Sequence, residues 1–303
     1  MKKIAVIGGG AAGLTASIYA LRANAEVTMF EQFGLGGLAA NIDRIDNYPG
    51  YISVEGWQLA SDMASQAKKL GLKVVRQKVL SLDRDGGEFV IVTDKGEYRF
   101  PAVVVATGTS HNKLGIESDY VGKGVSYCAT CDGSFYKGLP VAVAGGGNQA
   151  VREATYLADL CSKVYVLVPS DAFSAEESAV DNLLGRENVE AVYNATVTAI
   201  GGESAVENIT VYRKDGGSVV LPVRGLFVAV GATPVTGFIN VDGLDTSNGY
   251  IVVDGRSESS VKGLFAAGDV TAGALKQIVT ACADGAKAGS FASAYSAALL
   301  KNK

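Results

Sequence analysis

Short apolar runs, each followed by a glycine turn and an amphipathic stretch, recur along this chain, and one such pattern occurs twice. Residues 5–20 are AVIGGGAAGLTASIYA and residues 142–157 are AVAGGGNQAVREATYL. In each copy the apolar run predicts a buried β-strand, the glycines a tight turn and the following stretch a helix, which together open a βαβ unit. The second strand of each unit is predicted at residues 26–30 and 164–168. We therefore expect an α/β fold with two Rossmann-like nucleotide-binding domains.

The remaining apolar runs indicate how the two domains are connected. Buried strands, each leading into a glycine, are predicted at 103–106, 225–230 and 263–270. Residues 73–100 alternate short strands with turns, as a small antiparallel sheet does, and a helix is predicted from about 277 to 300. We expect the second domain to be inserted into the first. The predicted boundaries are 1–110 and 241–303 for the first domain and 111–240 for the inserted one.

Composition and charge narrow the range of functions. The chain has 303 residues, more than one domain usually holds. Lys and Arg total 27 against 31 Asp and Glu, a net charge of −4, which argues against nucleic-acid binding. No apolar stretch is long enough to cross a membrane, and the first residues lack the pattern of a signal peptide. We expect a cytoplasmic protein without nucleic-acid or membrane partners.

A glycine fingerprint follows the first predicted strand. Gly8, Gly10 and Gly13 stand where a helix begins, so backbone amides there can hold a pyrophosphate. Glu31 ends the second strand, where a carboxylate accepts hydrogen bonds from an adenosine ribose. Two further strand ends, Ala106-Thr107-Gly108 and Gly268-Asp269, complete a pattern typical of FAD domains rather than NAD domains. The first domain is therefore predicted to bind FAD.

One close cysteine pair, Cys128 and Cys131, precedes the second nucleotide fold. Two cysteines and a single histidine are too few ligands for structural zinc, so no metal site is expected and a redox dithiol is the better interpretation. A helix start lowers the pKa of a thiol. Asp132 directly follows the pair and is the candidate acid–base group, because the only histidine, His111, is remote in sequence.

The other cysteines and the histidine receive plainer interpretations. Cys161 and Cys282 lie in apolar helical stretches and are expected to be buried free thiols. His111 is expected to be a linker residue near the junction of the two domains.

Taken together, these motifs resemble the low-molecular-weight thioredoxin reductase family. The matching segments are CATCDG at 128–133, NYPG at 47–50, VVVATGT at 103–109, VGATP at 230–234 and GLFAAGDV at 263–270 followed by Lys276-Gln277. The resemblance implies a homodimeric flavoprotein that passes electrons from FAD to Cys128–Cys131 and then to thioredoxin. It also implies that Cys131 faces the flavin and that Cys128 attacks the partner disulfide.

The motifs and the resemblance together give one set of FAD-binding residues. It comprises Gly8, Gly10, Ala12, Gly13, Glu31, Gln32, Gly37, Leu38, Asn47, Val79, Ala106, Thr107, Gly108, Gly268, Asp269, Lys276, Gln277 and Ile278.

The chain departs from the family pattern at several positions. Leu38 replaces a glutamine of the flavin loop, and Gln149 and Arg152 replace a serine and an acid beside the second glycine turn. The family's His-Arg-Arg-x-x-x-Arg segment binds the 2′-phosphate of NADPH. Here the aligned positions carry no cation: they are Val168, Pro169, Ser170 and Ser174. The loop between them carries an acid, Asp171, so NADPH is expected to bind badly.

Several donors and functions stay open at this point. The leading hypothesis is a ferredoxin-dependent flavin thioredoxin reductase, and the alternatives are an NADH- or NADPH-dependent enzyme or a reductase of another thioredoxin-like protein. Asp171 could hold an NADH ribose, although Pro169 and Gln149 are expected to disturb the site. The CATCDG motif argues against a ferredoxin–NADP⁺ reductase and against a flavin-binding scaffold. An acidic ferredoxin would dock on a basic cluster, and the densest one is Lys68, Lys69, Lys73, Arg76 and Lys78.

Overall fold

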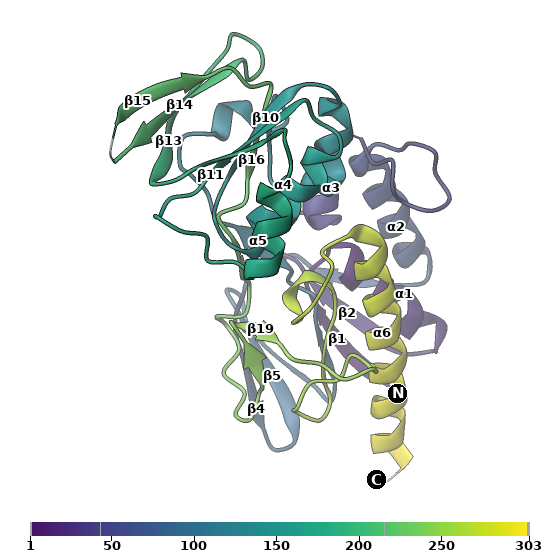
Figure 1. The fold of residues 1–303 in the computed structure, drawn as a ribbon. Coiled ribbons are helices and arrows are strands. Elements are labelled where there is room, and N and C mark those ends of the chain that lie inside the picture. Colours follow the sequence, from purple (N-terminus) through teal and green to yellow (C-terminus); the bar gives the residue numbers. More distant parts are fainter. Residues whose placement is uncertain (1, 43, 215, 302–303) are drawn as a thin grey trace. The chain divides into compact units, whose positions relative to one another are not determined.

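The structure is a computed structural model that describes residues 2–42, 44–214 and 216–301. The chain divides into two compact units, Met1–Ser110 with Thr233–Lys303 and His111–Ala232 (Figure 1). The second segment of the first unit begins at Thr233, whereas the sequence analysis places its start at 241. Residues 238–240 belong to the first unit because Leu82 exchanges backbone hydrogen bonds of 2.8 Å with Phe238 and Asn240.

A five-stranded parallel sheet forms the centre of the first unit. Its strands, in spatial order, are β20 (Leu264–Ala266), β7 (Val103–Val105), β1 (Lys3–Ile7), β2 (Glu26–Phe30) and β3 (Lys73–Val75). Since strands buried on both faces read as continuous apolar runs, the KIAVI sequence of β1 fits its central place. The helices of this unit are α1 (Ala11–Arg22), α2 (Gly56–Lys69) and α6 (Ile278–Lys301).

Two hydrophobic cores cover the two faces of this sheet. Ile4 and Val6 of β1 pack with residues of α1, α2 and α6. Ala5 and Ile7 face the opposite side and pack with an antiparallel sheet of β4 (Val79–Asp85), β5 (Glu88–Thr93) and β6 (Glu97–Phe100). The prediction of an antiparallel layer over 73–100 is therefore wrong for its first strand. Val74 and Val75 contact opposite cores, so β3 joins the parallel sheet instead.

The second unit repeats this plan around another five-stranded parallel sheet. Its strands, in spatial order, are β12 (Val189–Val192), β11 (Lys163–Leu167), β10 (Pro140–Ala144), β16 (Gly225–Val228) and β9 (Val125–Ser126). One face packs with the helices α3 (Ala129–Asp132), α4 (Asn148–Ala158) and α5 (Glu177–Leu184). The other face is covered by the antiparallel strands β13 (Ala195–Gly201), β14 (Asn208–Arg213) and β15 (Gly217–Leu221).

The short elements complete the chain. Single 3₁₀ turns span Gly37–Asn41, Ser118–Tyr120, Gly133–Tyr136 and Gly268–Val270, and short two-stranded pairs join β8 (Thr109–His111) to β17 (Ala232–Pro234) and β18 (Thr246–Ser247) to β19 (Tyr250–Ile251). The predicted repeat is thus present as β1–α1–β2 and β10–α4–β11, each with parallel strands. This confirms the α/β fold with two Rossmann-like domains.

Close packing of α1 against α6 brings the ends of distant strands together (Figure 1). A Cβ added to Gly285 would lie 2.2 Å from the Ala12 carbonyl oxygen, and one added to Gly289 would lie 2.1 Å from that of Ala16. Only glycine permits so close an approach at these two positions. The residues that precede α6 are thereby held beside the start of α1.

Candidate active site

The glycine turn after β1 combines two crowded positions with one open position. Gly8 has φ +105°, and an added Cβ would lie 2.4 Å from the Ala106 carbonyl oxygen. A Cβ on Gly13 would lie 2.0 Å from the Gly8 carbonyl oxygen. A Cβ on Gly10 would meet only the Cα of Gly37, at 3.9 Å. Gly8 and Gly13 are therefore required by packing, whereas Gly10 leaves space for an approaching group.

Gly10 is also the N-cap of α1, and because it has no side chain it caps none of the first-turn amides. Unpaired amides at a helix start, together with the positive end of the helix dipole, favour an anion such as a pyrophosphate.

A carboxylate lies over this turn. Glu31 accepts hydrogen bonds from the backbone N–H of Gly9 through Oε2 (2.8 Å) and from that of Phe33 through Oε1 (2.9 Å). The two bonds fix the carboxylate beside the turn, where the sequence predicted a ribose contact, and Gln32 next to it is exposed. The glycine cradle, the free amides and this carboxylate fit a dinucleotide.

The 3₁₀ turn Gly268–Val270 brings Asp269 to the same end of α1. Gly268 has φ +76°, and its added Cβ would lie 2.9 Å from the Cβ of Ala12. Burial raises the pKa of Asp269, an effect that Lys276 partly opposes. Ala106, Thr107 and Gly108 follow β7, so these candidates share the carboxyl edge of one parallel sheet, where α/β folds bind ligands.

The other predicted cofactor residues lie on several different elements of the first unit. Gly37 meets Gly10, and Asn47 donates a hydrogen bond of 3.1 Å to Gln277 Oε1, while Ile278 begins α6. Leu38 is exposed, and Lys276 donates to the Tyr250 hydroxyl at 2.9 Å. Val79 begins β4 and packs with the core on the antiparallel-sheet face of the parallel sheet.

Cys128 and Cys131 form a disulfide with a Cα–Cα separation of 5.3 Å. Cys128 is the N-cap of α3, and its Sγ accepts a hydrogen bond of 3.2 Å from the Cys131 N–H. Such a bond stabilises a sulfur that carries negative charge. Both cysteines are half-buried, so the pair is open to a reaction partner from the solvent side.

Asp132, the predicted acid–base group, is bound by a residue that the sequence analysis missed. The buried Ser126 hydroxyl donates to Asp132 Oδ2 at 2.6 Å and accepts from the Cys128 N–H at 3.0 Å. Its only sequence signal is its position at a strand end two residues before Cys128.

A second missed group lies on the same segment. Glu117 is buried and accepts hydrogen bonds from the Tyr127 hydroxyl (2.7 Å) and from two backbone amides. Burial alone would raise the pKa of Glu117, but these bonds outweigh it and lower the pKa. His111 begins the second unit, as expected for a junction residue, and stacks on the Tyr127 ring at 4.9 Å.

The second glycine turn keeps the geometry of the first. A Cβ on Gly145 would lie 2.3 Å from the Ala229 carbonyl oxygen, whereas one on Gly147, the N-cap of α4, would meet only Ser174 Oγ at 3.7 Å. Gln149 donates to Glu153 Oε1 at 2.9 Å, a bond between successive turns of α4. The backbone of the turn therefore keeps its shape with Gln149 in place.

The loop after β11 lies against this turn but offers it no cation. Ser174 donates its backbone N–H to the Gly146 carbonyl at 2.8 Å, and the Glu176 N–H donates to Asn148 Oδ1 at 2.9 Å. Val168 is fully buried, and the exposed side chains from 169 to 174 include an acid, Asp171, but no Lys or Arg.

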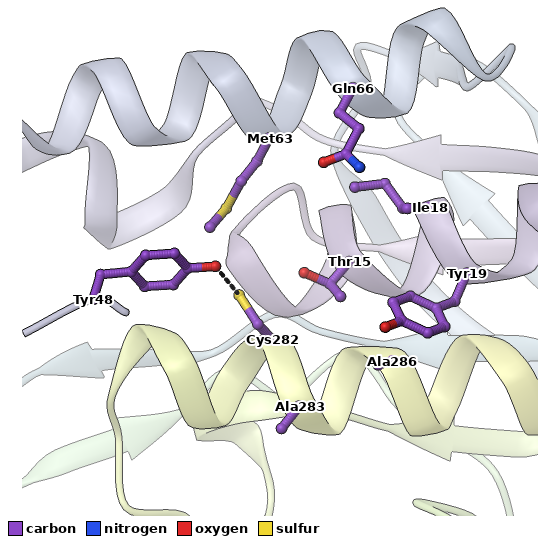
Figure 2. A pocket seen from close by; sticks show the side chains of 9 residues that line it. All are labelled: Thr15, Ile18, Tyr19, Tyr48, Met63, Gln66, Cys282, Ala283 and Ala286. Atoms are coloured by element: carbon purple, nitrogen blue, oxygen red, sulfur yellow. Dashed lines mark hydrogen bonds between the residues drawn. The ribbon is translucent and has the colours of Figure 1, made fainter. Parts of the chain in front are cut away.

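Cys161 and Cys282 are free thiols with different surroundings. Cys161 is buried as predicted, but the prediction is wrong for Cys282, which is half-buried and lines a cavity of about 300 Å³ among α1, α2 and α6 (Figure 2). The Tyr48 hydroxyl points into this cavity and contacts Cys282 Sγ at 3.8 Å. Burial, with a smaller effect of the Cys282 sulfur, raises the pKa of Tyr48 to about 12.

We expect alkylating reagents to distinguish these two thiols. Burial raises the pKa of Cys161 to about 11, so at about pH 8 only roughly one molecule in a thousand carries its reactive thiolate. Iodoacetamide should therefore modify Cys282 well before Cys161 while the Cys128–Cys131 disulfide is intact. Peptide mass spectrometry over time measures the order, and equal rates would contradict the burial of Cys161.

Within 2–42, 44–214 and 216–301, no three His, Cys, Asp or Glu side chains gather as metal ligands do. Among the helices that the structure describes, none combines the length and apolar character that a membrane span needs.

Two nucleotide folds and a disulfide at the start of a helix are the parts of a disulfide oxidoreductase. Residues 2–285 match the family described as pyridine nucleotide-disulphide oxidoreductase, and the chain belongs to this family. It is 37% identical over 296 residues to a thioredoxin reductase of Treponema pallidum (strain Nichols), with 96% of each chain covered. The chain is therefore a member of the low-molecular-weight thioredoxin reductases that its motifs resemble.

Solved structures agree with this assignment. A thioredoxin reductase of Streptococcus pyogenes superposes with a TM-score of 0.92 at 34% identity, covering 100% of this chain and 99% of that one. A ferredoxin–flavin thioredoxin reductase of Clostridium acetobutylicum gives a TM-score of 0.55 at 28% identity, covering 99% and 100%. The comparisons thus support the family but not the ferredoxin-dependent branch that the sequence analysis preferred.

Proposed function

We propose that this protein is an FAD-dependent thioredoxin reductase that takes electrons from a pyridine nucleotide. The observation that carries the proposal is the Cys128–Cys131 disulfide at the start of α3, with Asp132 hydrogen-bonded beside it. Thioredoxin as the partner is supported by the relatives that carry this name.

The first glycine cradle is the proposed FAD site. Gly8, Gly10 and Gly13 would hold the pyrophosphate, Glu31 the adenosine ribose, and Asp269 a hydroxyl of the ribityl chain. When bound, FAD supplies two-electron chemistry between a nucleotide and a disulfide. The cradle's open position at Gly10 and the uncapped amides of α1 are the structural support for this assignment.

The dithiol then carries the reducing equivalents to the partner. Two electrons and two protons convert the Cys128–Cys131 disulfide into two thiols. The Cys128 thiolate, favoured by the Cys131 N–H, attacks the partner disulfide, and Cys131 then attacks Cys128 Sγ and releases the reduced partner.

The intact second glycine turn favours a pyridine nucleotide as the donor, and the absence of cations from 169–174 favours NADH over NADPH. A 2′-phosphate placed there would meet the Asp171 carboxylate and no guanidinium. Ferredoxin is a second candidate, supported by the same missing cations. Its proposed docking surface is the set of exposed side chains Lys68, Lys69, Lys73, Arg76 and Lys78.

We expect thioredoxin reduction to run faster with NADH than with NADPH or reduced ferredoxin. Steady-state assays with the FAD-loaded protein and the three donors in parallel, at low and high salt, measure this. The variant Ser170→Arg/Ser174→Arg should raise kcat/KM for NADPH about tenfold by adding cations to the loop, and Ser118→Arg, an exposed serine of the turn Ser118–Tyr120, is the control. Turnover with ferredoxin alone would replace the nucleotide proposal, and no turnover with any donor would contradict the function.

A further inference from the structure

Ser126 joins the two parts of the redox segment through one hydroxyl group. Its Oγ accepts the Cys128 N–H at 3.0 Å and donates to Asp132 Oδ2 at 2.6 Å. Ser126 as a residue is only 5% exposed. The backbone of one redox cysteine and the predicted acid–base carboxylate are therefore connected through a hydroxyl that water hardly reaches.

The hydroxyl has one proton and two acceptors within reach. The Cys128 carbonyl oxygen lies 3.3 Å from Oγ, against 2.6 Å for the Asp132 carboxylate oxygen. The shorter distance is that of a hydrogen bond to a charged oxygen, which is the stronger kind. The proton is accordingly assigned to the bond with Asp132.

Ser126 is also the more deeply buried partner of the two. It ends β9 and pairs with Phe227 of β16, which is fully buried in the sheet. Asp132 is the last residue of α3, a helix of four residues, and so short a helix does not hold a side chain in place by its own stability. The strand therefore fixes the carboxylate through Ser126.

We propose that Ser126 is the positioning residue that holds Asp132 for proton transfer during thiol–disulfide exchange. The inference rests on the proposed function, since it assigns a role within that reaction. The Cys128 thiolate forms a bond to one sulfur of the partner disulfide, the partner S–S bond breaks, and the released sulfur takes up a proton. The Cys131 thiolate then forms a bond to Cys128 Sγ, and the second partner sulfur leaves and takes up another proton. Two electrons thus pass from the dithiol to the partner.

In this scheme Asp132 accepts the proton of a redox thiol and gives it to a released sulfur. Ser126 favours the ionised carboxylate by donating to Oδ2, and it fixes the orientation of the group. Without Ser126 the carboxyl group would hold its proton to higher pH and would lose its anchor on β9.

Other titratable groups surround Asp132. The two redox cysteines lie on its own segment, and Tyr136 lies on the following 3₁₀ turn. Burial raises the pKa of Tyr136, and the negative charge of Asp132 raises it further. Tyr156 of α4 is the nearest aromatic side chain to Gly133, since an added Cβ there would lie 3.0 Å from its ring. The raised pKa of Tyr136 lies well above the range in which a carboxyl group titrates.

The test uses holoenzyme reduced with dithiothreitol and freed of it, so that neither the electron donor nor donor-linked turnover enters the measurement. Oxidised thioredoxin is added, and the rate at which the Cys128 and Cys131 thiols disappear is followed from about pH 5 to 9. The variants are Ser126→Ala, Asp132→Asn, the double variant and Ser126→Thr, with Ser118→Ala as an exposed-serine control.

We expect Ser126→Ala to slow exchange about tenfold and to move the acid limb of the pH profile upward by about one unit. Asp132→Asn should slow exchange by about a hundredfold. Adding Ser126→Ala to Asp132→Asn should cost less than about twofold more, because Ser126 acts through Asp132. Ser126→Thr keeps the hydroxyl and should restore both the rate and the profile.

The possible outcomes distinguish a failure of the Ser126 role from a failure of the proposed thioredoxin reductase function. If the wild-type dithiol does not reduce thioredoxin, the proposed function fails. If it does, but Ser126→Ala behaves like the wild type, or slows Asp132→Asn as much as it slows the wild type, the inference is overturned. If Ser126→Ala does not fold, as judged by circular dichroism, Ser126→Gly replaces it under the same criteria. A Ser126→Thr pH profile that is shifted like the profile of the hydroxyl-free variant would also overturn the inference.

Discussion

Replacing Cys128 or Cys131 by serine is expected to lower thioredoxin reduction to background, a loss of roughly 10³-fold or more. Both sulfurs belong to one disulfide, so either replacement removes the bond that must be formed and broken in every cycle. A serine hydroxyl cannot substitute, because it neither forms such a bond nor ionises near neutral pH. Steady-state reduction of thioredoxin with the preferred donor measures the loss. Cys161→Ser, which removes a buried thiol distant in sequence from the pair, is the matched control and should keep most of the activity.

The two serine variants are expected to differ in what they trap. Cys131→Ser keeps the Cys128 sulfur at the N-cap of α3, so its thiolate can attack thioredoxin but nothing can resolve the mixed disulfide. Non-reducing electrophoresis should show a stable covalent complex with Cys131→Ser and much less with Cys128→Ser. The opposite result would exchange the roles that the family resemblance implies for the two cysteines.

Local sequence patterns predicted those parts of the fold whose signals are complete within a short segment. The β1–α1–β2 and β10–α4–β11 repeats each contain an apolar strand, a glycine turn and a helix, and both form as predicted. β3 was misassigned because three residues, Lys73–Val75, carry no pattern that tells a parallel strand from an antiparallel one. Its partner β2 is far away in sequence, so only the tertiary structure decides.

The candidate site residues also differ in whether a short sequence segment is enough to predict them. Gly8, Gly13 and the cysteine pair were found because their chemistry depends on spacing within a turn. Ser126 was missed because a serine gains its meaning from the partners of its hydroxyl, which packing supplies. Cys282 was misassigned because an apolar helix does not reveal which of its faces borders a cavity.

Gly10→Ala is expected to separate FAD binding from folding. A Cβ at Gly10 would meet only the Cα of Gly37, at 3.9 Å, so the apoprotein accommodates it without a clash. Gly10 also has φ −75°, a value that alanine adopts freely. The added methyl group would nevertheless occupy the space through which a pyrophosphate reaches the first amides of α1. Gly13→Ala differs, because its Cβ would lie 2.0 Å from the Gly8 carbonyl oxygen and would disturb the protein itself.

We therefore expect Gly10→Ala to keep the thermal stability of the apoprotein and to weaken FAD binding by about tenfold to a hundredfold, as the loss of one or two hydrogen bonds to a charged group does. Gly13→Ala should lower the apoprotein Tm by several degrees as well, because the clash acts without any ligand. Titration of apoprotein with FAD, followed by flavin fluorescence, gives the affinity, and differential scanning calorimetry gives the Tm. Gly34→Ala is the matched control, since its added Cβ has no neighbour within 4 Å and it lies in the loop facing the same turn. Unchanged FAD affinity in Gly10→Ala would mean that the open position at this turn is not the pyrophosphate site, and the assignment of FAD to this cradle would then be wrong.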